Sequence, residues 1–330
     1  IDIEKHYPPL KNILNADYYC PEVPANELVP LQPIPLNSQV EEIYGFPALG
    51  LNDLQEEYDV VSIVWPVQSF DDSNDRPFTP ERRRFFKERI FPLIESKKAK
   101  EVWWFDDCDR AIVGKGHQWL LDNGYPCTHI FKREYRRTHT WDYQDNVYPF
   151  PFMTFGKPNP PWMLYEKRVR GNEGVPGCFW SGAPISRFQA GVSDEWCNRL
   201  GILQQVHQHL HIKSGLPKEE FLHQFNTYKC FLHLNGTGHL CGRFFEGLSR
   251  DSLMMMQEMD TVFPFQDEMF FAEECIFEMP HEFIEKLDRL MADKELYDKC
   301  KEQQEQVLNT YFNYDYIRSY IASKVGYEEV

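Results

Sequence analysis

A glycine-rich turn between two apolar segments holds the residues of this 330-residue sequence that are best suited to chemistry. The stretch HLNGTGHLCGRFFEGL, residues 233–248, follows the apolar run YKCFL and precedes the run DSLMMMQ. A strand, a glycine-rich turn and a helix in this order form an anion site, because the first helical turn exposes unpaired amide groups and the positive end of the helix dipole. Glycine also lets the backbone approach phosphate oxygens without an intervening Cβ. We therefore expect this turn to bind a phosphate-containing ligand.

Two charged residues of the expected helix extend this prediction. Arg243 stands in its first turn, where a guanidinium can make a bidentate contact to a diphosphate. Glu246 follows on the same face, so its carboxylate could accept hydrogen bonds from the two hydroxyls of a ribose. In a simpler interpretation the glycines only make a turn and Arg243 pairs with Glu246 on an exposed helix. The predicted binding residues are Gly236, Thr237, Gly238, His239, Leu240, Cys241, Gly242, Arg243 and Glu246.

Acidic segments follow apolar runs in the N-terminal half. FDDCDR, residues 105–110, ends the run VWWF, and alternation along a strand would point Asp107 and Asp109 the same way. Positioned carboxylates of this kind can act as general bases, which makes these two aspartates the favoured pair. For any one of them, helix capping or solvation is the simpler role. The competing candidates are Asp71, Asp72, Asp75 and His117, with Asp72 the preferred one of these.

The segments that must position these residues alternate between strand and helix patterns. In the N-terminal half we expect strands at 58–66, 101–110 and 127–135, with helices at 82–94 and 114–125, the second closed by Gly124. In the C-terminal half we expect strands at 178–182, 228–236 and 251–257, with helices at 191–210, 218–226 and 242–250 and two more after Pro280. Such alternation predicts parallel sheets, whose ligand sites form at the carboxyl ends of the strands.

Length and composition bound the organisation of the chain. At roughly 150 residues per domain, 330 residues predict two domains, and the proline-rich stretch at 149–177 is the expected connection. The net charge of −16 argues against general binding to nucleic acid or to an anionic membrane surface, so an anionic ligand needs a local site. Nine scattered cysteines without a CxxC pair indicate reduced, mostly buried thiols and neither a zinc site nor a disulfide framework.

The glycine-rich segment also resembles a known family. YKCFLHLNGTGHLCGRFFEGLSRDSLMMMQ is similar to the donor-binding element of exostosin-like and protein O-glucosyltransferase-like glycosyltransferases of the GT-B fold. CFWSGAPISRF resembles an earlier element of the same half, in which an arginine at the place of Arg187 also contacts the diphosphate. Loops in KREYRRT and NVYPFPF resemble glycosyltransferases encoded by large algal viruses. One departure is Cys241-Gly242, where a serine commonly precedes the arginine.

The resemblance implies an α/β protein of the GT-B class, with two Rossmann-like domains facing across a cleft and C-terminal helices crossing back. Residues 1–160 would bind the acceptor, a glycan or protein hydroxyl, and residues 161–330 would bind the nucleotide sugar. The implied donor is a UDP-sugar, with xylose or glucose as the expected sugar. Arg187 and Arg243 would neutralise the leaving diphosphate without a metal, and Asp107, Asp109 or Asp72 would be the base of an inverting transfer.

Two alternatives stay open. An apolar strand followed by Asp107-Cys108-Asp109 is also the arrangement with which GT-A glycosyltransferases bind Mn²⁺ or Mg²⁺ and a diphosphate, although it leaves the glycine-rich turn unexplained. The chain could instead be a non-catalytic module that retains a nucleotide or glycan without turnover.

The expected location is cytoplasmic. No run approaches the ~20 apolar residues of a membrane span, and the first residues lack the pattern of a signal peptide. The only glycosylation sequon, Asn235-Gly236-Thr237, lies inside the expected ligand loop, where a glycan would block the site.

Overall fold

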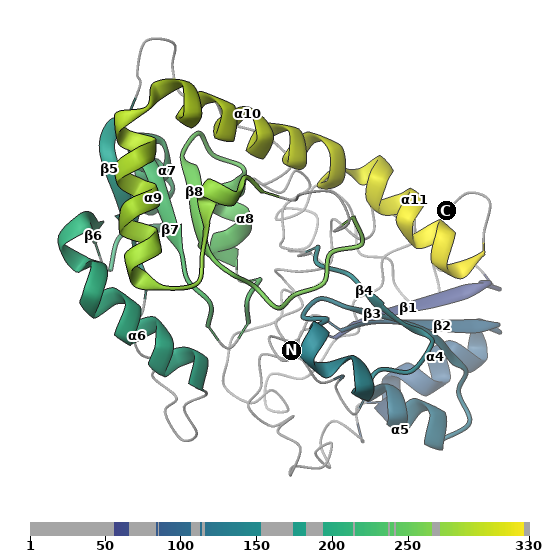
Figure 1. The fold of residues 1–330 in the computed structure, drawn as a ribbon. Coiled ribbons are helices and arrows are strands. Elements are labelled where there is room, and N and C mark those ends of the chain that lie inside the picture. The colour runs from purple at the N-terminus through teal and green to yellow at the C-terminus, as the bar shows by residue number, and fades with distance from the viewer. Residues whose placement is uncertain are drawn as a thin grey trace. The chain divides into compact units, whose positions relative to one another are not determined.

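The computed structural model describes residues 56–65, 84, 86–106, 113, 116–152, 174–182, 194–213, 215–236, 238–240, 242–265 and 271–326. The chain divides into two compact units. Unit 1 comprises Ile1–Pro160 together with Ile317–Val330, and unit 2 comprises Pro161–Tyr316. Each unit is built on its own sheet (Figure 1).

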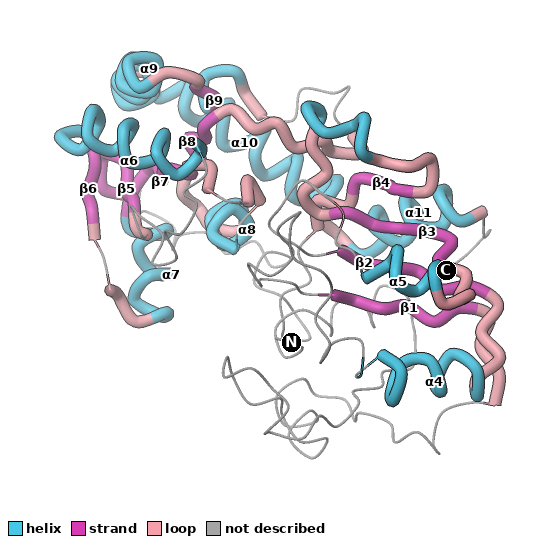
Figure 2. Tube along the Cα trace, turned by 90° about the horizontal axis from the view of Figure 1, so that it is seen from below, coloured by secondary structure: helices cyan, strands magenta, loops and turns pink. Residues whose placement is uncertain are grey.

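The sheet of unit 1 has four parallel strands in the order β1-β2-β3-β4 (Figure 2). They are β1 Val60–Trp65, β2 Glu101–Asp106, β3 Cys127–Lys132 and β4 Val147–Pro149. Asp106, the last residue of β2, is in register with Trp65 on one side and Lys132 on the other. The carboxyl ends of these three strands therefore meet at one edge of the sheet.

Side-chain alternation divides the residues of this sheet between two apolar faces. On one face Val102, Trp104 and Ile130 pack with residues of α4 Phe91–Ser96 and α5 Gly116–Asp122. A π-helical turn, Phe86–Ile90, leads into α4. The segment that ends α5 includes Gly124 at φ +85°, in the left-handed conformation that glycine adopts at helix ends, as predicted.

The other face of this sheet is aromatic. The rings of Phe105 and Phe131 stack with their centroids 4.7 Å apart, and Phe150 meets both edge-on. Tyr320, on α11 Tyr314–Val325, donates a hydrogen bond from its hydroxyl to the carbonyl of Pro149 at 2.6 Å. The C-terminal part of the chain therefore returns to the N-terminal unit, as the predicted crossing back requires.

The sheet of unit 2 has five parallel strands in the order β6-β5-β7-β8-β9. They are β5 Val175–Trp180, β6 Leu210–Ile212, β7 Tyr228–His233, β8 Leu253–Gln257 and β9 Ile276–Phe277. The neighbours β5 and β7 lie near the centre, so the loops that follow them leave the sheet side by side. This is the place where ligands bind in open α/β sheets.

Helices cover both faces of this second sheet (Figure 2). Figure 2 shows α6 and α9 on one side and α7 and α8 on the other. The helices are α6 Asp194–Val206, α7 Lys218–Thr227, α8 Gly242–Leu248, α9 Pro280–Ala292 and α10 Lys294–Tyr311. Alternate strand residues such as Cys230 and Leu232 pack with α6, α9 and α10, whereas Phe231 lies against α7 and α8.

The cysteines agree with the prediction of reduced, buried thiols. Those that the structure describes are all free and buried: Cys127, Cys178, Cys230, Cys275 and Cys300. Burial raises the pKa of the Cys127 thiol to about 12 and that of Cys178 well above its usual value. The thiols of Cys127 and Cys178 therefore stay protonated at neutral pH and serve as small apolar groups.

The predicted α/β class with two parallel-sheet units is confirmed, and several elements differ. The two-residue strand β9 of unit 2 lies outside the predicted strands. The helix expected to run to residue 210 ends at Val206, because residues 210–212 form the edge strand β6, which pairs with β5. Three helices, not two, follow residue 279. The structure also has a fourth strand in unit 1, β4, whose three residues are too few to give a recognisable strand pattern in the sequence.

Among the described helices, none combines the length and the hydropathy needed to span a membrane.

Helix α8 can approach β7 only because residue 247 is glycine. A Cβ built on Gly247 would overlap the ring of Phe231, which is 1% exposed. We expect Gly247→Ala to lower the free energy of unfolding by about 1–3 kcal/mol, as overpacking of a core does. Gly201→Ala is the control, because Gly201 lies on α6 and a methyl group added there would have no neighbour within 4 Å. Urea unfolding should show Gly201→Ala to be neutral or stabilising by about 0.5–1 kcal/mol; equal losses in both variants would contradict this packing constraint.

Candidate functional site

Arg243 joins the loops that follow β5 and β7 in unit 2. It lies in the first turn of α8, and its guanidinium rests on the backbone of Gly182, two residues after β5. A Cβ on Gly182 would lie 2.5 Å from Nη1 and 2.9 Å from Nη2 of Arg243, so only glycine leaves room for this contact. The arginine therefore brings α8 into contact with the loop after β5 at the carboxyl edge of the sheet.

The charge of Arg243 is not neutralised within the part of the chain that the structure describes. The side chain is half-buried, yet it has no hydrogen bond or ion pair there. Glu246, also half-buried, is thus not its ionic partner, and the interpretation of an exposed Arg243–Glu246 pair is wrong. A half-buried guanidinium without a carboxylate partner is suited to receive an anionic ligand.

The glycine-rich loop between β7 and α8 is fastened by hydrogen bonds of its own. The amide of Gly236 donates to the carbonyl of Gly238 at 3.3 Å. The buried imidazole of His233 lies 2.8 Å, Nε2 to O, from the carbonyl of His239, so Nε2 is the donor. The amide of Asp260 donates to Nδ1 of His239 at 3.3 Å. Gly238, His239 and Leu240 are all buried.

Asn235 anchors the start of this loop to the end of β8. Its amide donates to the side-chain oxygen of Gln257 at 3.1 Å, and its Nδ2 donates to the carbonyl of Glu258 at 2.7 Å. The residue is 6% exposed. Because Nδ2 is buried and already bonded, the folded protein has no room for a glycan on the Asn235 sequon, in agreement with the expectation that a glycan is incompatible with this loop.

Arg199 is a residue of this site that sequence reasoning missed. It projects from α6 and is 4% exposed. Its Nε donates to the carbonyl of Asn235 and its Nη2 to the carbonyl of Leu234, both at 2.9 Å. A Cβ on Gly236 would overlap the same guanidinium. In the sequence, an arginine in the middle of an amphipathic helix looks like a solvated side chain, so no local signal could have identified it.

The remaining predicted residues fall outside the described part of the chain. They are Asp72, Asp107, Asp109, Arg187, Thr237 and Cys241. Their roles stay predictions. Gly236, Gly238, His239, Leu240, Gly242, Arg243 and Glu246 are described, and all of them lie between β7 and the end of α8.

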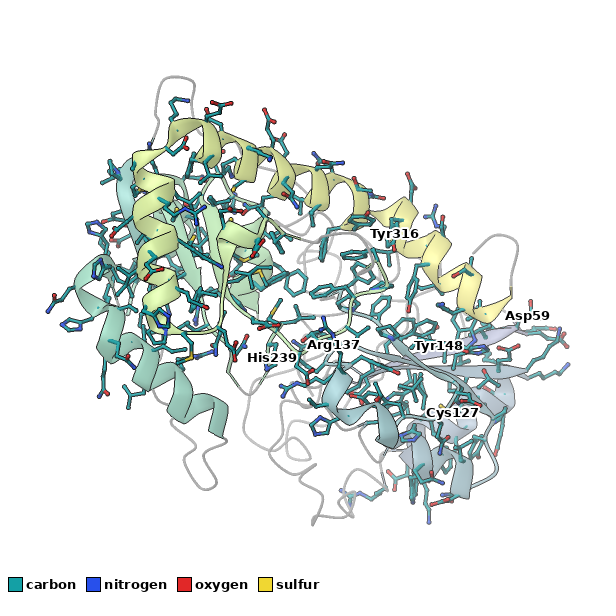
Figure 3. The ribbon with its side chains drawn as sticks, in the orientation of Figure 1. Asp59, Cys127, Arg137, Tyr148, His239 and Tyr316 are labelled. Atoms are coloured by element: carbon teal, nitrogen blue, oxygen red, sulfur yellow. The ribbon has the colours of Figure 1, made fainter. Side chains whose placement is uncertain are left out.

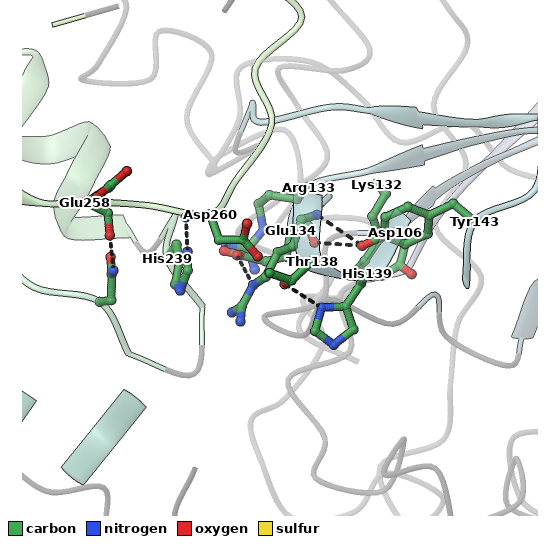
Figure 4. Close-up of polar contacts among 12 residues, drawn as sticks. Asp106, Lys132, Arg133, Glu134, Thr138, His139, Tyr143, His239, Glu258 and Asp260 are labelled. Carbon is green, nitrogen blue, oxygen red and sulfur yellow. Dashed lines mark hydrogen bonds and ion pairs between the residues drawn. The ribbon is translucent and has the colours of Figure 1, made fainter. Parts of the chain in front are cut away.

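The carboxyl edge of the unit 1 sheet carries buried charges (Figure 4). Asp106 and Lys132, the last residues of β2 and β3, form an ion pair of 3.3 Å with side-chain exposures of 1% and 0%. Just beyond β3, the buried carboxylate of Glu134 lies 3.7 Å from both Arg133 Nη1 and Arg136 Nε. Of the arginines of KREYRR, only Arg137 is exposed (Figure 3).

Tyr143 contacts this cluster through Arg136. Its hydroxyl oxygen accepts a hydrogen bond from the amide of Arg136 at 3.1 Å, and burial raises its pKa. The phenol therefore stays neutral.

Among the described residues, no group of three or more His, Cys, Asp or Glu side chains could hold a metal ion.

Comparison with known proteins finds similar structures and no match by sequence. No protein-family model and no curated protein matches the chain. The structure is similar to T4 phage BGT in complex with UDP and Mn²⁺, at 10% identity and a TM-score of 0.43, over 84% of each chain. It is similar to a mutant of T4 phage BGT in complex with UDP-glucose, at 10% identity and a TM-score of 0.47, over 83% of this chain and 85% of the other.

A third similar structure is a Thermobaculum terrenum O-GlcNAc transferase mutant, at 10% identity and a TM-score of 0.41, over 71% of this chain and 49% of the other. These scores are too low to carry an argument about function.

The buried pair of Asp106 and Lys132 predicts a large cost for removing one partner alone. We expect Lys132→Met to lower the free energy of unfolding by about 3–5 kcal/mol, because it removes the ammonium group that lies 3.3 Å from a buried carboxylate. The control is Lys100→Met, which breaks the exposed pair with Asp59 and should cost less than about 1 kcal/mol. Denaturant unfolding measures both values, and similar losses would show that burial does not set the strength of the Asp106 pair.

Proposed function

We propose that this chain is a glycosyltransferase that binds a nucleoside-diphosphate sugar in unit 2 and transfers the sugar to a hydroxyl acceptor. The observation that carries the proposal is the guanidinium of Arg243, half-buried at the carboxyl edge of a parallel sheet, resting on Gly182 and without an ionic partner among the described residues. In a chain of net charge −16, such a cation marks a local site for an anion. A diphosphate fits the bidentate geometry of a guanidinium.

In the proposed reaction, the acceptor oxygen attacks the anomeric carbon of the sugar as the bond from that carbon to the diphosphate oxygen breaks. The leaving diphosphate takes the electron pair of this bond, and an aspartate takes the proton of the acceptor hydroxyl. Arg243, with Arg187, neutralises the charge that grows on the diphosphate, so the transfer needs no metal. Glu246 holds the ribose hydroxyls. The base is Asp107, Asp109 or Asp72, and displacement from the opposite face inverts the anomeric carbon.

The finer assignments follow the resemblance to exostosin-like and protein O-glucosyltransferase-like enzymes. On that basis the donor is a UDP-sugar that carries xylose or glucose, and the acceptor is a glycan or protein hydroxyl. Helix α8 is only seven residues long, so its dipole is small. We therefore expect the Arg243 side chain to contribute more to anion binding than the helix dipole does.

Loss of the Arg243 guanidinium should abolish tight nucleotide binding. We expect Arg243→Ala to weaken UDP binding about 10- to 100-fold, the loss of a charge-assisted, bidentate contact. Isothermal titration with UDP, in EDTA and then with Mn²⁺, measures it. Binding that requires Mn²⁺ and is unchanged in Arg243→Ala would overturn this assignment and move the site to Asp107-Cys108-Asp109. UDP binding without sugar transfer to any acceptor would favour a non-catalytic module.

The position of the Arg243 guanidinium against Gly182 can be tested by a substitution that keeps the charge of Arg243. In Gly182→Ala the new methyl group displaces the guanidinium, so we expect UDP affinity to fall about 10-fold while the fold is kept. Gly201→Ala, which adds a methyl group in open space on α6, should bind UDP as the wild type does. Unchanged affinity in Gly182→Ala would mean that the position of Arg243 on Gly182 is not the one that binds the nucleotide.

A further inference from the structure

In unit 2, two arginines make matching contacts: each extends from the helix that follows one strand to the loop that follows the other. α6, the helix that follows β5, sends Arg199 to the loop after β7, where it lies against Gly236. α8, the helix that follows β7, sends Arg243 to the loop after β5, where it lies against Gly182. We call these two contacts the arginine–glycine pairs. They are reciprocal, because each helix places its arginine against the loop that follows the other strand.

The two arginines of these pairs differ in what they touch. Arg199 is 4% exposed and donates to two successive main-chain carbonyls, those of Leu234 and Asn235, each at 2.9 Å. Arg243 is half-buried and has no hydrogen-bonding partner among the described residues. Arg199 therefore fixes protein backbone, whereas Arg243 is the one positioned for a ligand.

Capture of two successive carbonyls sets the direction of the chain where β7 ends. In a continuing strand, successive carbonyls point to opposite sides, so one side chain cannot bind both. Because Arg199 binds both carbonyls, the backbone leaves the direction of β7 at this point and enters the glycine-rich loop. Gly236 has an ordinary φ, so its role is to leave space for the guanidinium and not to adopt a left-handed turn.

We propose that Arg199 is a positioning residue that holds the glycine-rich loop in the conformation that binds the nucleotide, and this rests on the proposed function of the site. Arg199 acts through the peptide groups of residues 234–236 and does not touch the ligand. A lysine keeps the charge but cannot supply two donors in the fixed fork of a guanidinium. The exchange Arg199→Lys therefore separates geometry from charge.

The experiment compares Arg199→Lys and Gly236→Ala with the control Gly201→Ala, which changes α6 two residues from Arg199 without meeting any neighbour. Amide hydrogen exchange of a peptide spanning residues 234–240 reports loop order without any ligand. A peptide spanning β8 reports whether the fold is intact. UDP titration then measures affinity for the same four proteins, wild type included.

We expect Arg199→Lys and Gly236→Ala to exchange at least 10-fold faster in the loop, with β8 unchanged, and to bind UDP about 10-fold more weakly than the wild type. Gly201→Ala should match the wild type in both measurements. Fast loop exchange with wild-type UDP affinity would overturn the positioning role. Unchanged loop exchange in both variants would overturn it too, whether or not UDP binds. A wild type that binds no nucleotide, together with faster loop exchange in the variants, would refute the proposed function while it leaves the fastening by Arg199 intact.

Discussion

The candidate site of unit 2 depends on close contact between guanidinium groups and bare backbone. Arg199 lies on Gly236 and Arg243 on Gly182, in positions that any side chain at those glycines would fill. Because β5 and β7 are parallel neighbours, the loops after them leave the same edge of the sheet, and each loop leads into a helix. The two arginines exploit this geometry. Each one links the helix that carries it to the loop after the other strand, which ties two otherwise independent loops into one surface.

The carboxyl edges of the two sheets handle buried charge in opposite ways. In unit 1, Lys132 lies against Asp106, and Arg133 and Arg136 lie against Glu134, so cations there have carboxylates within 4 Å. Burial makes such pairs costly to break and stiffens the ends of β2 and β3. In unit 2, Arg199 binds main-chain carbonyls and Arg243 keeps its charge available. The second edge is thus the better one for an anionic ligand, even though the chain as a whole is acidic.

One glycine of the loop, Gly236, also has a packing role that the sequence did not predict. Glycine-rich turns suggest either left-handed backbone or close approach to phosphate. The backbone of Gly236 is not left-handed, and its amide donates to the carbonyl of Gly238 within the loop. What it provides is space for a side chain from another helix. Gly247 does the same for the ring of Phe231, which lets the short α8 lie close to β7.

The sequence by itself determined the α/β class, the positions of most strands and helices, and the glycine-rich turn that holds the candidate site of unit 2. These follow from local information: apolar runs of strand length, helical periodicity and a glycine-rich turn between them are all legible within ten or twenty residues. It could not identify β6, where three residues are a strand only because β5 lies beside them. Nor could it show that Arg199 is buried beneath a loop 35 residues away, or that Arg133 and Arg136 are buried and Arg137 is exposed. Those facts depend on which distant carbonyl, carboxylate or glycine meets each guanidinium, and only the tertiary structure decides that.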